Sequence, residues 1–305
     1  MDFRAIIMGV AFALMWASAF TTTRIIVTAA PPLLALVIRF ALSAGVAIAL
    51  AFALGQSWRL SRAEWRAVIL FGICQNVLYL GLNWVAMQWV EASAAAIIAS
   101  MMPLLVAVMG WALMGDRLKP MAVAGLVIGM VGVAIIMGVR LQHGLNIPGT
   151  ILCLIGAVAL AAATLSARGA GGSPNMMMIV GLQMAVGAVV LVVPALALEW
   201  GEPVQWSARL LWTFAYTAIV PGILATWIWF QLVHRVGAVR AATYHFLSPF
   251  FGVTIAALML GERFGFTDVA GALIIAAGIL MVQLARLPAP DQASKSRAQS
   301  IAGRD

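Results

Sequence analysis

The side chains with the greatest chemical potential in this sequence lie inside an apolar run, in the stretch YHFLSPFFG at residues 244–252. Tyr244, His245 and Ser248 could bind a solute through hydroxyl and imidazole groups, or could act as a nucleophile beside its base. A nucleophilic constellation also needs an acidic group that orients the base, and every Asp and Glu of the chain falls in a predicted loop, tail or helix end. The stretch therefore predicts a binding site, and we expect no enzymatic activity.

His245 differs from the other two histidines, because His143 lies in a predicted loop and His234 at the boundary of an apolar run. A histidine buried in an apolar span most often satisfies a hydrogen bond. It can also titrate near neutral pH, which would make His245 a site where proton movement is coupled to solute movement.

A second polar stripe runs along the apolar segment 67–89. Gly72, Asn76, Tyr79 and Asn83 recur at spacings of three and four residues, which places them on one face of a helix. Asparagine in an apolar span needs hydrogen-bond partners, so we expect this face to line a cavity. The alternative is that the two amides bond a neighbouring helix.

Tryptophans extend the predicted site, because an indole N–H deep in an apolar run needs a partner. Trp16 is included for this reason, and either Trp227 or Trp229 is expected to line the path, of which we include Trp227. The predicted binding residues are therefore Trp16, Asn76, Tyr79, Asn83, Trp227, Tyr244, His245 and Ser248.

Arg39 lies about seven residues into the run 32–54. Its guanidinium could attract a solute carboxylate, but we favour a role in which it snorkels or bonds the carbonyls of a helix end. Gln183 takes the equivalent place in the run 175–198 if the two halves of the chain pair at an offset of 144 residues.

The elements that carry these residues must be long and apolar. Of the 305 residues 64% are apolar and 9% are charged, and the apolar residues come in runs near twenty long, the length that spans a bilayer. We predict an all-α integral membrane protein with ten transmembrane helices in the lipid bilayer. The predicted runs are 5–23, 32–54, 67–89, 92–114, 120–139, 148–167, 175–198, 209–232, 237–260 and 266–286. The first run contains WASAF, which resembles a signal-peptidase site, but it is long enough to be a retained helix.

The net charge of +8 arises from Lys and Arg scattered over short loops, a pattern that argues against nucleic-acid binding. These basic residues gather in the loops on one side of the predicted spans, which indicates that both termini are cytoplasmic. Cys74 and Cys153 lie in apolar runs, so we expect no disulfide, metal site or cofactor.

The chain also repeats itself at an offset of 146 residues. This offset aligns Pro103 with Pro249, and it aligns Gly125 with Gly271, Gly132 with Gly278, and Gly115-Asp116-Arg117 with Gly261-Glu262-Arg263. Five helices in each half place the halves in opposite orientations, as in transporters with inverted repeats. We assign residues 1–142 to the first repeat, 143–286 to the second and 287–305 to a disordered cytoplasmic tail. Pro103 and Pro249 are expected to kink their helices and to serve as a gate.

This pattern of two five-helix halves, each with an apolar proline-containing stretch, a G-[DE]-R motif and a glycine-rich last helix, resembles the EamA-type members of the drug/metabolite transporter superfamily. Trp16-Ala17 and Arg39 add to the likeness. Within that family the chain is most similar to the YddG-type exporters of aromatic amino acids. The resemblance implies export of small metabolites through a cavity between the halves, in the bacterial inner membrane.

A cavity with amide, hydroxyl, imidazole and aromatic groups but no carboxylate suits a zwitterionic solute, so we expect an amino acid with an apolar or aromatic side chain, carried by alternating access. The transporter could function as a monomer. Alternatives are a nucleoside, a purine or a sugar derivative as the solute. A membrane enzyme or a receptor that transports nothing would be a different class of protein.

Overall fold

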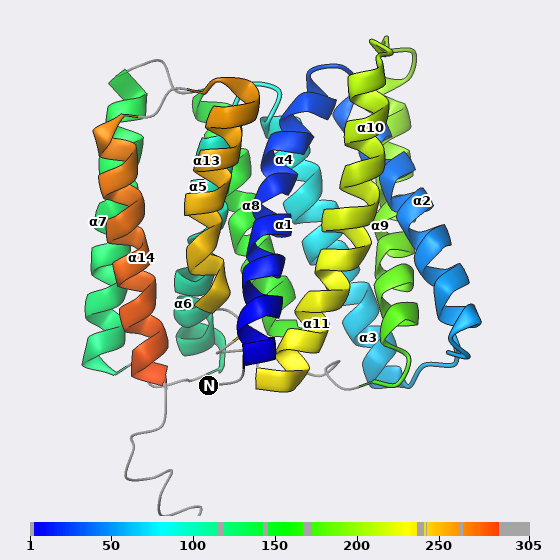
Figure 1. Cartoon of the computed structure of the whole chain (residues 1–305), viewed down its shortest axis with the longest axis horizontal. Helices are drawn as coiled ribbons and strands as arrows, with labels where there is room; N and C mark the ends of the chain where they lie inside the picture. The colour runs from blue at the N-terminus through cyan, green and yellow to red at the C-terminus, as the bar shows by residue number, and fades with distance from the viewer. Residues whose placement is uncertain are drawn as a thin grey trace, which may run out of the picture.

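The structure, a computed structural model, describes residues 3–114, 119–142, 146–166, 173–236, 241, 243–262 and 265–286. All regular structure within these ranges is helical, and the helices stand side by side (Figure 1). In chain order they are α1 (Phe3–Val27), α2 (Pro32–Ala53), α3 (Arg62–Phe71), the π-helix η1 (Gly72–Leu80), α4 (Gly81–Ala86), α5 (Ala92–Ala99), α6 (Met102–Met114), α7 (Pro120–Gln142), α8 (Ile147–Ser166), α9 (Met176–Glu199), α10 (Ala208–Thr217), the π-helix η3 (Ala218–Leu224), α11 (Ala225–Val236), the 3₁₀-helix η4 (Thr243–Leu247), α13 (Ser248–Leu260) and α14 (Phe266–Arg286). The predicted tail 287–305, the Gly115-Asp116-Arg117 motif and Arg263 lie outside the described residues.

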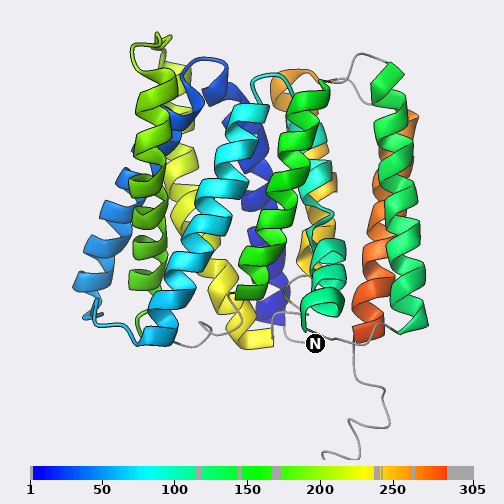
Figure 2. The same cartoon turned by 180° about the vertical axis from the view of Figure 1, so that it is seen from behind.

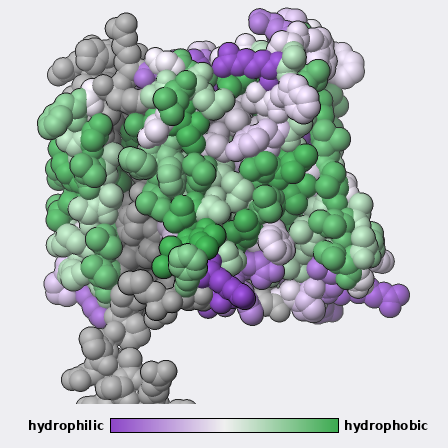
Figure 3. Space-filling model, in the orientation of Figure 1, coloured by the Kyte–Doolittle hydropathy of each residue, from purple (hydrophilic) through white to green (hydrophobic). Residues whose placement is uncertain are grey.

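The outer surface has the character of a membrane protein. Seven helical segments of the described chain are long and apolar enough to cross a bilayer: Phe3–Val27, Pro32–Ala53, Arg62–Ala86, Ala92–Ala112, Ile147–Ser166, Met176–Glu199 and Ala208–Val236. Shorter apolar helical stretches occur at Pro120–Gly132, Phe250–Leu260 and Val269–Gly278, so the count of ten spans stays a prediction. Large apolar side chains such as Val193 and Leu258 are 73% and 82% exposed, and hydrophobic residues cover the middle height of the visible face (Figure 3). Such a belt is stable in lipid and would be costly in water.

Two helix pairs form the opposite ends of the molecule, α7 with α14 and α2 with α9 (Figures 1 and 2). In the first pair, a Cβ atom on Gly132 would lie 2.8 Å from the carbonyl oxygen of Gly271, and one on Gly278 would lie 2.5 Å from that of Gly125. The 146-residue offset aligns Gly132 with Gly278 and Gly271 with Gly125, so each of these two contacts is the repeat-related copy of the other. Such a reciprocal pair of contacts is what a two-fold axis between antiparallel helices produces.

The other helix contacts follow the same rule. The first helix of the first half, α1, packs against α13, α11 and η3, while the first helix of the second half, α8, packs against α6, α4 and η1. Exchanging the two halves converts one set of contacts into the other. The contact pattern therefore agrees with the repeat that the sequence predicts.

Irregular turns also occupy equivalent positions in the two halves. The π-helix η1 begins at Gly72 and η3 at Ala218, which are 146 residues apart. In the next helix of each half, α6 begins at Met102 and α13 at Ser248, again 146 residues apart. In each half, the third apolar segment thus contains a π-helix and the fourth is interrupted.

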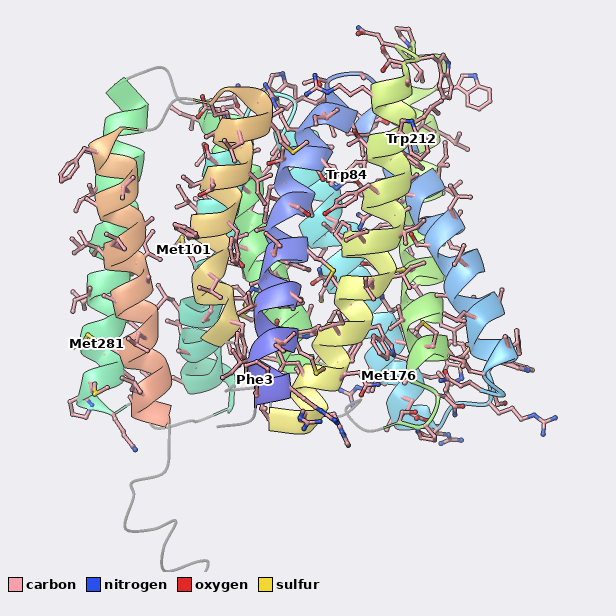
Figure 4. The ribbon with its side chains drawn as sticks, viewed as in Figure 1. Phe3, Trp84, Met101, Met176, Trp212 and Met281 are labelled. Atoms are coloured by element: carbon pink, nitrogen blue, oxygen red, sulfur yellow. The ribbon has the colours of Figure 1, made fainter. Side chains whose placement is uncertain are left out.

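The two aligned prolines mark these interruptions, but they do not kink a continuous helix as predicted. Pro103 is the second residue of α6, directly after the turn at Ser100 and Met101, and Pro249 lies in the first turn of α13. Proline is well tolerated there because the first N–H groups of a helix have no partner within it. Met101 lies about halfway along the height of the bundle (Figure 4), so the break in the fourth helix falls near mid-membrane.

Two helix N-termini of the first half are capped by carboxylates from the second half. Glu199 accepts hydrogen bonds from the backbone N–H groups of Leu33 (3.0 Å) and Leu34 (2.8 Å) at the start of α2. Glu262 accepts from those of Ala92 (2.9 Å) and Ser93 (3.1 Å) at the start of α5. A carboxylate at a helix N-terminus is favoured by both the free N–H groups and the helix dipole.

Candidate functional site

A cavity of about 70 Å³ lies between the two halves of the chain, and α1, α2 and the π-helix η1 contribute much of its wall. Its described lining contains amide, hydroxyl and aromatic side chains, one histidine and one arginine, but no Asp or Glu. The volume is room for a few water molecules, so the cavity is narrow and would have to widen to hold a larger solute. Helices of both halves meet here, where a transporter of this architecture holds its solute.

In the cavity lining, three aromatic rings surround His245. The rings of Phe12, Trp16 and Trp229 lie 5.1, 5.7 and 5.1 Å from the imidazole, all three at steep angles to it. His245 is brought among them because it belongs to η4, which packs against α1. Edge-to-face contacts of this kind are the favoured geometry for aromatic rings, so the cluster forms a firm, apolar wall with one imidazole in it.

The aromatic wall continues onto η1. Trp16 stacks on Tyr79 with a centroid distance of 6.2 Å and an angle of 7° between the rings. Tyr79 is 2% exposed, and its neighbour in the predicted stripe, Asn83, donates a hydrogen bond from Nδ2 to the Tyr79 carbonyl (2.9 Å). Two nearly parallel rings separated by this distance offer flat apolar surfaces of the kind that bind aromatic or aliphatic groups.

A pair of amides joins η1 to α9. Asn76 Nδ2 donates to the backbone carbonyl of Gln183 (2.7 Å) and to its Oε1 (2.5 Å), and both side chains are buried and line the cavity. Gly187 makes room for this contact, because a Cβ atom there would lie 2.6 Å from the Asn76 Cβ. Asn76 thus fulfils both roles considered for it, since it bonds a neighbouring helix and lines the cavity.

Arg39 holds the equivalent π-helix of the second half. Pro221 lies inside η3 and has no N–H, so it leaves a carbonyl in the preceding turn without its helical partner. Arg39 Nε donates to the Thr217 carbonyl (3.2 Å), and Ser43 Oγ donates to the Ala218 carbonyl (3.0 Å). Arg39 thus bonds a backbone carbonyl, as one of the favoured roles has it, but this carbonyl lies where α10 continues into η3 and not at the end of the apolar segment.

Arg39 and Gln183 therefore have matching places, as the offset of 144 residues predicts. Gln183 on α9 contacts η1 through Asn76, and Arg39 on α2 contacts η3 beside Gly222, which the 146-residue offset aligns with Asn76. The two contacts differ in chemistry, because one is an amide pair and the other a guanidinium. The cavity is symmetric in its scaffold and asymmetric in its polar groups.

The structure brings five of the eight predicted binding residues to the cavity wall: Trp16, Asn76, Tyr79, Asn83 and His245. Tyr244 instead packs beside Ala5 and Leu232, and Ser248 is buried away from the described lining. We expected Tyr244 and Ser248 to share a helix face at a spacing of four residues. They do not, because Tyr244 lies in the 3₁₀-helix η4 while Ser248 begins α13.

Trp229, and not Trp227, is the tryptophan of α11 in the lining. Trp227 is partly buried and packs against the main apolar core. The lining also contains Phe12, together with Arg39 and Gln183, and the last two were weighed in the sequence without being included in the site. A signal for Arg39 and Gln183 was present, since both are polar residues in long apolar runs.

Comparisons with known proteins agree with this architecture. The profile of the EamA-like transporter family matches the chain twice, at residues 3–138 and 147–284. The chain is 25% identical to the uncharacterized transporter YvbV of Bacillus subtilis (strain 168) over 289 residues, which cover 95% of this chain and 91% of the relative. It is 24% identical to protein PecM of Dickeya dadantii (strain 3937) over 271 residues, 88% of this chain and 89% of the relative.

A solved crystal structure with 20% sequence identity superposes with a TM-score of 0.66 and covers 94% of this chain and all of the other. At that identity the likeness concerns the fold. The family profile accounts for nearly the whole chain in two copies, with relatives named as transporters along its length. The chain belongs to the EamA-like transporter family and is a multi-pass membrane transporter.

Proposed function

We propose that this transporter exports small zwitterionic metabolites, foremost amino acids with aromatic or apolar side chains. The observation that carries the proposal is the cavity between the halves, whose described lining pairs an aromatic cluster with amides and lacks any carboxylate. Aromatic faces suit the side chain of such a solute, and amides and the other polar groups suit its charged ends. The direction of transport follows from the resemblance to exporters of amino acids.

The proposed architecture is ten transmembrane helices in two inverted repeats of five, in the bacterial inner membrane, with both termini cytoplasmic. The reciprocal glycine contacts of α7 and α14 and the paired irregular turns support the inverted repeat. In this arrangement the halves rock about the cavity to expose it to one side at a time. The helix breaks at Pro103 and Pro249 would let parts of the fourth helices move, and one chain would suffice.

Uptake into proteoliposomes tests the function. Purified protein is reconstituted, and flux of a panel of labelled amino acids, nucleosides and sugars is measured with and without a pH gradient. We expect flux of aromatic and large apolar amino acids above that of empty liposomes. If a nucleoside, a purine or a sugar derivative were transported and no amino acid were, the proposal of an amino acid as the solute would be wrong. Flux that ignores the pH gradient and persists in His245→Ala would remove His245 as a coupling site.

Substitution of Trp16 tests the aromatic wall. Trp16→Ala removes the ring that stacks on Tyr79 and contacts His245, so we expect kcat/KM for an aromatic amino acid to fall about 10–100-fold. Trp212→Ala is the matched control, because Trp212 is 76% exposed on α10 and points away from the bundle (Figure 4). Equal flux in the two variants would contradict the assigned role of the ring.

A further inference from the structure

We infer that Arg39 and Trp84 form the subsite that binds the carboxylate of the transported solute. This inference rests on the proposed function and deepens it, because it states which part of the solute is required and which side chains recognise it. Both side chains line the cavity, Arg39 from α2 and Trp84 from α4. Neither residue belongs to the aromatic wall around His245.

The guanidinium of Arg39 is a buried charge that lacks an anionic partner. Arg39 is 5% exposed. Within the described part of the chain it makes one hydrogen bond, from Nε to the Thr217 carbonyl, and it forms no ion pair with a carboxylate. The remaining N–H groups of the guanidinium are therefore available to a ligand. A buried charge is stabilised when it is paired, which an anionic solute would accomplish.

The surroundings of Arg39 fix its head group in place. Its Cζ lies 5.4 Å from the ring centre of Phe40 and 5.6 Å from that of Trp84. Gly222 of η3 lies directly beside the head group, since a Cβ atom there would lie 3.5 Å from Nη2 of Arg39 and 3.3 Å from Oγ of Ser43. A guanidinium held by aromatic faces and one backbone bond is preorganised, so that little entropy is lost when a ligand binds.

Trp84 adds a second donor without a partner. It is 1% exposed, and its buried Nε1 has no hydrogen-bond acceptor among the described residues. An indole N–H that is buried usually finds an acceptor. The guanidinium carbon of Arg39 lies 5.6 Å from the centre of the Trp84 ring. A carboxylate has two acceptor oxygens, so it could bond the remaining N–H groups of Arg39 and also offer an acceptor to this indole.

The inference predicts which solutes are carried. Phenylalanine and 3-phenylpropionate both present a carboxylate to Arg39, whereas phenethylamine has the same ring without the acid. Labelled forms of all three are assayed in proteoliposomes with the wild-type protein and with Arg39→Gln, Trp84→Phe and Ser43→Ala. We expect the wild type to carry phenylalanine at least about 10-fold faster than phenethylamine, since a lost hydrogen bond to a charged group changes affinity by about that factor or more.

The variants separate recognition from structure. Arg39→Gln should lower phenylalanine flux about 10–100-fold and remove the preference over phenethylamine, and Trp84→Phe should lower it about 3–10-fold. Ser43→Ala is the structural control, because it removes the bond to the neighbouring carbonyl of η3 and lies outside the lining. It should keep the preference unchanged, and monodisperse elution of each variant confirms folding.

The outcomes distinguish this inference from the function on which it rests. Phenylalanine flux and preference that survive in Arg39→Gln would overturn the carboxylate subsite and leave amino-acid transport standing. The same holds if Ser43→Ala abolishes the preference as completely as Arg39→Gln does. Arg39-dependent flux of 3-phenylpropionate without flux of amino acids would support the subsite and overturn the amino-acid proposal. Flux of phenethylamine alone would overturn both.

Discussion

Gly278→Val is expected to yield little folded transporter, because a side chain at this position would collide with the backbone of α7. Its Cβ would lie 2.5 Å from the Gly125 carbonyl oxygen and 2.5 Å from the Gly129 nitrogen. Backbone atoms cannot rotate away as a flexible side chain can, so α7 and α14 would have to separate. Overpacking of this kind costs about 1–3 kcal/mol or more. In thermal unfolding followed by size-exclusion chromatography in detergent, we expect a Tm lower by about 10 °C or a loss of the monodisperse peak.

Gly45→Val provides the matched control. Gly45 is also in a long apolar helix, α2, but nothing lies within 4 Å of a Cβ built on it. The same substitution there should leave the Tm within about 3 °C of the wild type. Gly132→Val should repeat the effect of Gly278→Val, because its Cβ would meet the Gly271 carbonyl oxygen at 2.8 Å. If Gly278→Val were as stable as Gly45→Val, the close and reciprocal packing of the two helices would be wrong.

The helices could be predicted from the sequence because the lengths of apolar runs are set by the bilayer and the repeat by aligned glycines. The repeat was visible in the sequence because four glycines align in two pairs, Gly125 with Gly271 and Gly132 with Gly278. Only small residues at these positions permit the close approach of α7 and α14. The stripe of Asn76, Tyr79 and Asn83 was predictable for a similar reason, because polar residues in apolar helices need partners. That argument requires only approximate helical spacing.

The misplaced residues follow interruptions that a regular α-helical spacing does not anticipate. Each residue beyond 3.6 in a turn rotates the following side chains by about 100° relative to an uninterrupted α-helix. Trp227 and Trp229 come after the π-helix η3, and the cavity receives Trp229. Tyr244 and Ser248 lie on either side of the junction between η4 and α13, so their spacing of four does not place them together. In the sequence, Pro221 was the one sign that the helix is interrupted at η3.

The Asp and Glu residues were only partly predictable from the sequence. The sequence places them in loops and at helix ends, which excluded them from the membrane-buried site. In the structure, two of them cap the N-termini of helices. Glu199 and Glu262 both come from the second half and cap helices of the first. Sequence reasoning could place them outside the cavity, but it could not find their partners, because the pairing depends on contacts between distant helices.

Glu199→Ala is expected to destabilise the transporter by about 3–5 kcal/mol. The helix α2 follows Pro31 and begins with Pro32, neither of which has an N–H, so Leu33 and Leu34 carry its first two donors. Both donate to Glu199, which is 9% exposed, and Ala35 bonds the Pro31 carbonyl (2.9 Å). Removing the carboxylate leaves two shielded backbone donors unsatisfied, at about 1–3 kcal/mol each, and removes a favourable charge from the helix N-terminus.

Thermal unfolding in detergent measures the effect against two companion variants. Glu202→Ala removes the same charge three residues away at an exposed position, so it should change the Tm little. Glu199→Gln keeps one acceptor oxygen but loses the charge, and it should fall between the wild type and Glu199→Ala. This order arises only if the carboxylate acts as a two-oxygen cap that joins the second half of the chain to α2. Equal Tm values for Glu199→Ala and Glu202→Ala would instead mean that the N–H groups of Leu33 and Leu34 find water, and that the first half holds the start of α2 without the second.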